Sequence, residues 1–110
     1  MKFEKNENHT LLKPTENDPQ DFFLVFKEKY SNFIDENLIL DFSDFKGVKT
    51  ENILLFLQFA IDHRNNGMSF VIVNNEVEID SIPQDINVVP TEAEARDLIE
   101  MEEIERDLGF

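Results

Sequence analysis

The amino-acid sequence predicts a single α/β domain, in which a mostly parallel sheet of four to five strands packs against about three helices. The chain has 110 residues, which is the size of one domain. Short apolar runs alternate along it with helical patterns, and this alternation is typical of parallel sheets with right-handed crossovers. Two short runs near the N-terminus flank a polar turn and indicate an antiparallel hairpin at one edge.

The hairpin is expected to pair residues 3–5 with residues 10–13 across the turn at 6–8. The first helix should follow directly, because Asp18 is a good N-cap and Pro19 suits the first helical position. Aromatic residues then recur at helical spacing and predict one apolar face, made of Phe22, Phe23, Phe26, Tyr30 and Phe33.

Two nearly continuous apolar runs, residues 37–42 and 68–73, have the pattern of central parallel strands covered on both faces. A second helix should run between them from a cap at Thr50 to about residue 65, with Gly67 beyond its end. Its expected inner stripe is Ile53, Leu54, Leu57, Ala60 and Ile61.

The last strand is expected at residues 86–89, after an irregular polar segment at 74–85. Pro90 ends this strand, and the capping-box pattern from Thr91 to Glu94 opens an acidic C-terminal helix over about residues 91–108. The apolar positions of this helix are Ala95, Leu98, Ile99, Met101, Ile104 and Leu108. We expect Phe110, beyond the stop residue Gly109, to fold back onto the domain or to fill a partner's pocket.

The charge of the chain excludes some partners. The formal net charge is −14, so DNA, RNA and anionic membrane surfaces would be repelled. Residues 92–107 hold eight acids and two bases, a net charge of −6. This run is either a solvated helix face or a docking face for a basic partner. No apolar stretch reaches the roughly 20 residues needed to cross a bilayer, and the expected location is the cytoplasm.

The sequence offers little for catalysis. It has no cysteine, no glycine-rich phosphate loop and only two histidines, His9 and His63, which lack metal-binding spacing. His63 is expected to interact with the dipole at a helix C-terminus, and His9 to lie on the surface of a strand. We therefore expect a protein that is not an enzyme and holds no metal or cofactor. One alternative stays open, a hydrolase or phosphotransfer protein with magnesium held by Asp41 and Asp44.

Several runs, in this order and spacing, resemble the STAS domain family, the anti-anti-sigma factor-like proteins. The hairpin at 3–13 resembles the opening hairpin of that family, and residues 38–45, Leu-Ile-Leu-Asp-Phe-Ser-Asp-Phe, resemble its signature strand. The helix from Thr50, the strand at 68–73 and the run Val88-Val89-Pro90-Thr91-Glu92-Ala93 occupy the corresponding later positions. The resemblance implies a STAS-like fold and a role in protein–protein interaction.

In that family a kinase phosphorylates a serine in an Asp-Ser-Ser-Gly turn at the start of the second helix. The matching residues are Lys49, Thr50, Glu51 and Asn52, so Glu51 replaces the phosphorylated serine. A shift of one residue would place Thr50 there instead. The resemblance thus implies a partner-binding surface that lacks the usual switch, made of Asp44, Lys46, Lys49, Thr50, Glu51 and Asn52.

Two kinds of protein partner follow from these observations, an anti-sigma-like kinase or an enzyme. In the second case the chain would be an accessory subunit that binds through its acidic C-terminal helix. Small STAS-like chains of this kind are associated with ribonuclease Z, but the HxHxDH metal cluster of that hydrolase is missing from this sequence.

Overall fold

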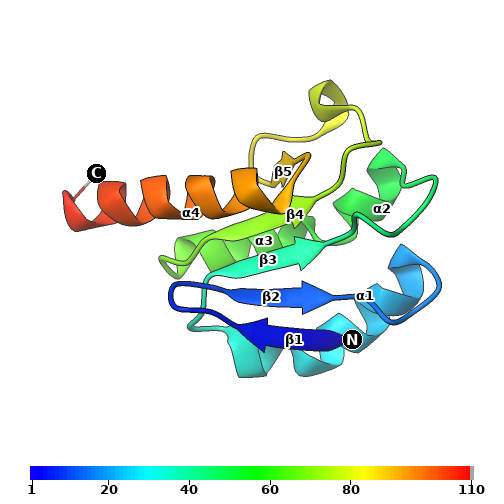
Figure 1. The fold of residues 1–110 in the computed structure, drawn as a ribbon, viewed down its shortest axis with the longest axis horizontal. Coiled ribbons are helices and arrows are strands. Elements are labelled where there is room, and N and C mark those ends of the chain that lie inside the picture. Colours follow the sequence, from blue (N-terminus) through cyan, green and yellow to red (C-terminus); the bar gives the residue numbers. More distant parts are fainter. Residues whose placement is uncertain (110) are drawn as a thin grey trace.

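The computed structural model describes residues 1–109, which form one five-stranded sheet with helices on both faces (Figure 1). The strands stand in chain order across the sheet, and β1 is antiparallel to β2 while all other neighbours are parallel. The predicted fold class is confirmed. The strands are β1 (Lys2–Lys5), β2 (Thr10–Lys13), β3 (Leu38–Asp41), β4 (Phe70–Val73) and β5 (Asn87–Val89).

Four α-helices and two short 3-10 helices connect or follow the strands: α1 (Pro19–Lys29), η1 (Tyr30–Phe33), α2 (Thr50–Leu54), α3 (Leu57–Asn65), η2 (Ile79–Ser81) and α4 (Glu92–Asp107). The predicted caps of the first and last helices are present. The Asp18 carboxylate accepts a hydrogen bond from the Asp21 amide at 2.8 Å, and the Thr91 hydroxyl accepts one from the Glu94 amide at 3.2 Å. Each cap satisfies an amide that the helix itself leaves unpaired.

The parallel strands are buried on both faces, as their apolar runs predict. On β3, Leu38 and Leu40 face the larger core with α1, α2 and α3, while Ile39 faces α4. The same alternation places Phe70 and Ile72 of β4 on the larger core and its two valines under α4. Figure 1 shows α4 on one side of the sheet with α1 and α3 on the other.

The second helix differs from the sequence prediction, because it is interrupted between Leu54 and Leu57. The Phe56 amide bonds to the Ile53 carbonyl at 3.0 Å, an i→i+3 contact that tightens the chain there. The buried residues are consequently Ile53, Phe56, Ala60 and His63. The expected stripe was wrong in part, since Leu57 and Ile61 are only half-buried and Leu54 is exposed.

Both histidines are buried, contrary to the expectation that His9 lies on the surface of a strand, and His63 lies in the last turn of α3 at the helix C-terminus expected for it. His63 is fully enclosed beneath η1, and its ring is hydrogen-bonded to Tyr30 and to the main chain of Glu36. His9 is enclosed at the hairpin, where its ring contacts the side chains of Asn6 and Asn8. The partners of His9 lie in the adjoining turn, whereas those of His63 are distant in sequence.

The C-terminal helix α4 projects beyond the sheet (Figure 1), so its apolar positions fall in two environments. Ala95 and Ile99 are buried against the sheet, whereas Met101, Ile104 and Leu108 are exposed. The expectation for Phe110 lies outside the described residues. Within residues 1–109, no helix is long and apolar enough to cross a membrane.

Candidate functional site

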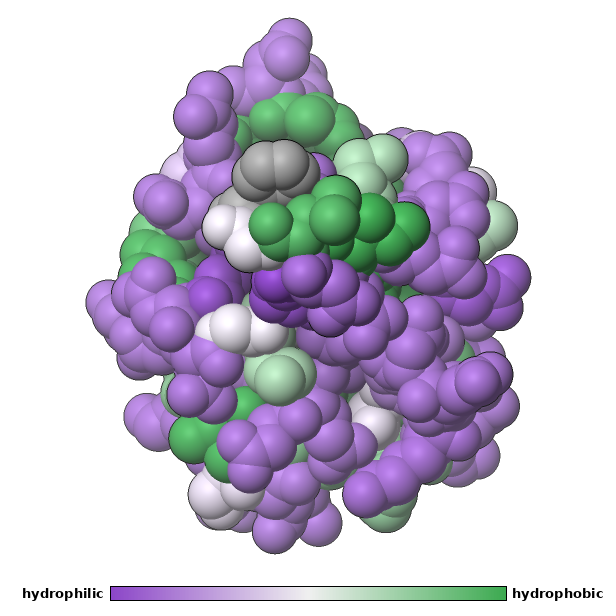
Figure 2. All heavy atoms as spheres, turned by 90° about the vertical axis from the view of Figure 1, so that its left-hand side faces the viewer, coloured by the Kyte–Doolittle hydropathy of each residue, from purple (hydrophilic) through white to green (hydrophobic). Residues whose placement is uncertain are grey.

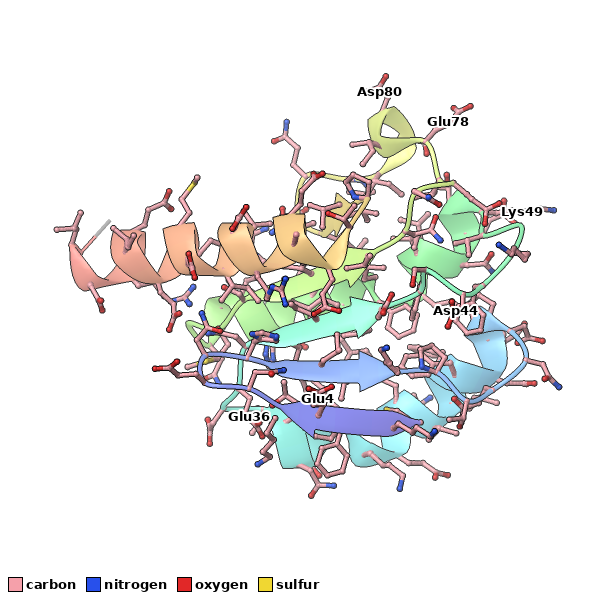
Figure 3. The ribbon with its side chains drawn as sticks, viewed as in Figure 1. Glu4, Glu36, Asp44, Lys49, Glu78 and Asp80 are labelled. Carbon is pink, nitrogen blue, oxygen red and sulfur yellow. The ribbon has the colours of Figure 1, made fainter. Side chains whose placement is uncertain are left out.

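The predicted partner-binding residues lie where the parallel strands end, on the loop from β3 to α2 and on the first turn of α2. A second loop, from the end of β4 through η2, lies beside it. Figure 3 shows Asp44 and Lys49 at this edge, with Glu78 and Asp80 pointing outward at the start of η2 and within it, while Glu36 lies at the opposite end of the sheet. The two loops are called here the β3–α2 loop (residues 42–49) and the β4–η2 loop (residues 74–81).

Asn74, buried at the end of β4, is the main link between these loops. Its amide nitrogen donates to the Phe42 carbonyl at 3.2 Å, and its side-chain oxygen accepts from the amides of Glu76 and Val77 at 2.9 and 3.0 Å. One side chain thereby satisfies three main-chain groups that no strand or helix pairs. The path of both loops depends on it.

Two further hydrogen bonds join the loops nearer the surface. The Gly47 amide donates to a Glu76 carboxylate oxygen at 3.4 Å. The Thr50 and Ser81 hydroxyl oxygens lie 2.5 Å apart, and Ser81 also donates to the Glu78 carbonyl at 2.7 Å. Since the single hydrogen of Ser81 goes to Glu78, Thr50 is the donor in the contact between the two hydroxyls.

The start of α2 corrects the predicted cap. Lys49, not Thr50, is the N-cap residue, and Thr50 is the first helical residue. The Asn52 side chain reaches back to accept a hydrogen bond from the Lys49 amide at 2.9 Å. The Thr50 side chain therefore caps no helix amide, and its hydroxyl contacts Ser81 instead.

The six predicted partner-binding residues lie on one continuous segment, but they are not equally exposed to solvent. Asp44, Lys46, Lys49 and Glu51 are exposed, while Thr50 and Asn52 are partly covered by their hydrogen bonds. Phe45 and Val48 alternate with them and point into the core. The buried side chains of Phe45 and Val48 anchor the backbone of the β3–α2 loop to the core. The charged side chains of the loop are therefore held in defined positions.

The sequence prediction missed the contribution of the β4–η2 loop to this surface. This loop adds the exposed acids Glu76, Glu78 and Asp80 beside the two lysines of the first loop. A turn-forming Asn at the end of an apolar run is the only signal in the sequence that points to it. The combined surface is mixed in charge and predominantly acidic.

The magnesium alternative requires carboxylates that converge. One Asp41 oxygen accepts a hydrogen bond from the Ser43 amide at 3.0 Å, and Asp44 is exposed on the loop. Within the part of the chain that the structure describes, no group of three or more His, Asp or Glu residues is placed to hold a metal ion.

A second polar cluster lies at the opposite, amino end of the parallel strands. Glu36 accepts a hydrogen bond from the Thr10 hydroxyl and lies 3.6 Å from the Lys5 ammonium. Its main-chain oxygen is 2.6 Å from Nε2 of His63. Burial lowers the pKa of His63, and the hydrogen bond to the Glu36 main chain and then the Asp35 carboxylate oppose this more weakly. The groups satisfy one another, so this cluster is a structural network.

No protein-family model matches the sequence, and no curated protein matches it at a significant level.

Proposed function

We propose that this protein is a non-enzymatic protein–protein interaction module that resembles STAS domains and binds its partner through residues 44–52. The supporting observation is the way this surface is built. Four charged side chains stand exposed on a loop whose apolar residues are buried and whose main chain is hydrogen-bonded to the neighbouring loop. Such a preorganised polar surface loses little conformational entropy on binding.

We propose that the charge of this surface is fixed and is not switched by phosphorylation. In the first turn of α2, Glu51 is an exposed carboxylate at the position that the resemblance assigns to a phosphorylated serine. The neighbouring hydroxyl, on Thr50, is engaged by Ser81. A carboxylate carries one charge, whereas a phosphate carries about −1.5 to −2. We therefore propose constitutive binding to a cytoplasmic partner, an anti-sigma-like kinase or an enzyme.

Site-specific photocrosslinking in cells tests this proposal. A photoreactive amino acid at Lys46 or at Glu51 should yield the same discrete adduct with one protein. The matched control places it at Lys27 or at Glu28, which are also exposed and lie on α1. Identical adducts from both pairs of positions, or none from the first pair, would contradict the proposal.

Charge reversal then tests the interface with the captured partner. The K46E/K49E variant should weaken binding, whereas K27E/K29E, with the same change in net charge, should not.

Replacing Glu51 with Ser or with Lys separates binding from folding. If affinity is unchanged while the free energy of unfolding falls by a few tenths of a kcal/mol, Glu51 acts only in the first turn of its helix.

A second candidate function is supported by a different observation. The outer face of α4 exposes three apolar side chains where the helix extends past the sheet. This feature favours the alternative of an accessory subunit that binds an enzyme through its acidic C-terminal helix. A ribonuclease Z-type enzyme is one such partner under this alternative.

A further inference from the structure

The last three turns of α4 carry a narrow apolar stripe that no part of the described chain covers. Met101, Ile104 and Leu108 are 57%, 59% and 66% exposed. Their spacing of i, i+3 and i+7 places them within about 60° of the helix circumference and along about 10 Å of its length. In Figure 2 this end of the molecule faces the viewer, and hydrophobic side chains gather there on a largely hydrophilic surface.

The same turns are held in place from their inner side. Arg106 donates to the Ser69 hydroxyl at 3.2 Å and to the Asn37 side-chain oxygen at 3.3 Å, and Ser69 donates to a Glu102 carboxylate oxygen at 2.6 Å. The Glu103 carboxylate accepts from Asn8 at 3.2 Å. The projecting part of α4 is thus attached to the amino end of the sheet, and its outward face is presented in a defined orientation.

Acidic side chains surround the stripe on both flanks and at its beginning. All are exposed, and none forms an ion pair within residues 1–109: Glu94, Asp97, Glu100, Glu105 and Asp107. A narrow apolar seam with charges on both sides is the pattern by which one helix packs along another. The charge of the flanks then decides which helix can approach.

We propose that the outer face of α4 binds a cationic amphipathic helix of a partner protein. The partner helix presents apolar side chains at i, i+3 or i+4, and i+7 to Met101, Ile104 and Leu108, with Lys or Arg on both sides opposite the five carboxylates. This surface is distinct from residues 44–52, and the inference rests on the second candidate function, for which it names the kind of helix that α4 binds. A second copy of the chain does not fit, since it would set five acids against five acids.

The test begins with a selection. A phage-displayed library of 20-residue peptides with randomised positions on a helix-forming Ala scaffold is selected on the intact protein. Recovered sequences should be enriched in Lys and Arg and should carry apolar residues at the helical spacing given above. Enrichment of acidic or neutral peptides, or recovery of no binding sequence, would overturn the proposal.

The most enriched peptide is then measured by fluorescence anisotropy against three variants. The M101Q/I104Q/L108Q variant keeps helix-forming residues, and its affinity should fall by about tenfold or more. The control, L24Q/I34Q/I79Q, removes three apolar side chains of comparable exposure elsewhere and should bind as the wild type does. Binding should also weaken with added salt, because the flanking charges are exposed.

The third variant, K46E/K49E, distinguishes the two proposals. A peptide that loses affinity for this variant but not for M101Q/I104Q/L108Q would overturn the inference about α4 while supporting the surface at residues 44–52. Equal affinity for wild type and all variants would overturn the inference as well. Thermal unfolding followed by circular dichroism confirms that each variant is folded before its affinity is compared.

Discussion

The Tyr30 hydroxyl oxygen lies 2.7 Å from Nδ1 of His63, and both side chains belong to the interior cluster that joins η1 to α3. On the other side of the ring, Nε2 lies 2.6 Å from the Glu36 carbonyl. A carbonyl can only accept, so Nε2 carries the hydrogen and Nδ1 accepts from Tyr30. Nδ1 can accept only while the ring is neutral, and burial, which lowers the pKa of His63, favours that form in the folded protein.

This arrangement makes stability depend on pH. Burial lowers the pKa of His63 in the folded state, so the unfolded chain binds its proton more readily. Stability is full above the unfolded-state pKa of about 6.5 and falls as the pH drops from there towards the lowered folded-state pKa. Urea unfolding at pH 7.5 and 5.5 should show this loss in the wild type and a smaller loss in His63→Gln.

At pH 7.5, His63→Gln should itself cost about 1–3 kcal/mol, because Gln cannot satisfy Tyr30 and Glu36 with the same geometry. The control is His9→Gln, since burial also lowers the pKa of His9. The double variant should lose the pH dependence of both rings. An unchanged loss between pH 7.5 and 5.5 in His63→Gln would contradict the assignment.

Phe56 is the centre of the aromatic core. Its ring centroid lies 5.1–6.1 Å from those of Phe22, Phe23, Phe26 and Phe42. Phe56→Ala should cost about 3–5 kcal/mol in the free energy of unfolding measured with urea. The adjacent Leu57→Ala should cost clearly less, because Leu57 is only half-buried. An equal cost for the two would mean that the helix face is misassigned.

These two residues show what the sequence could predict about the fold. The succession of strands and helices along the chain, the caps at Asp18 and Thr91 and the apolar β3 and β4 follow from local patterns, and the structure has them. The inner face of the second helix could not be read in this way. Its apolar residues are so dense between Ile53 and Ile61 that either Phe56 or Leu57 fits a helical stripe. The interruption at Leu55 and Phe56 decides between them.

The candidate site could be predicted from the sequence only in part, and for a different reason. The β3–α2 loop could be predicted because it follows an apolar strand and precedes a helix. Its pairing with the β4–η2 loop depends on the Asn74 bond to Phe42 and the Thr50 bond to Ser81, which join residues 32 and 31 positions apart. Such contacts leave no periodic signal. The burial of His63 was missed for the same reason, since its partners Tyr30 and Glu36 are 33 and 27 positions away.

Asn74 should be the residue on which both loops depend most. Asn74→Ala removes one donor and one acceptor and leaves the Glu76 and Val77 amides unpaired, while the Phe42 carbonyl keeps its bond from the Phe45 amide. The expected cost is about 2–5 kcal/mol, since each unpaired buried group costs about 1–3 kcal/mol and the opened loop regains some water. Asn75→Ala, at an exposed neighbour, should change stability by less than about 0.5 kcal/mol. Similar costs for both variants would contradict the role given to Asn74.

The hydrogen bond between Thr50 and Ser81 is tested by a double-mutant cycle. Thr50→Val keeps the branched shape but loses the donor, and should cost about 0.5–1.5 kcal/mol, whereas Thr50→Ser should cost less. Because Ser81 is the acceptor, Thr50→Val and Ser81→Ala together should cost less than the sum of the two. Hydrogen exchange should also quicken at the Gly47 and Lys49 amides in Thr50→Val, as the loops separate. Strict additivity would show that the Thr50 hydroxyl is free.

A free Thr50 hydroxyl would bear directly on how the surface is controlled. A phosphate on Thr50 would break the bond to Ser81 and stand close to the acids of the β4–η2 loop, so it should separate the loops by charge repulsion. Mass spectrometry of the protein isolated from its native cells should therefore find Thr50 unmodified. Phosphorylated Thr50 at substantial occupancy would contradict constitutive binding, because it would supply the switch that Glu51 cannot.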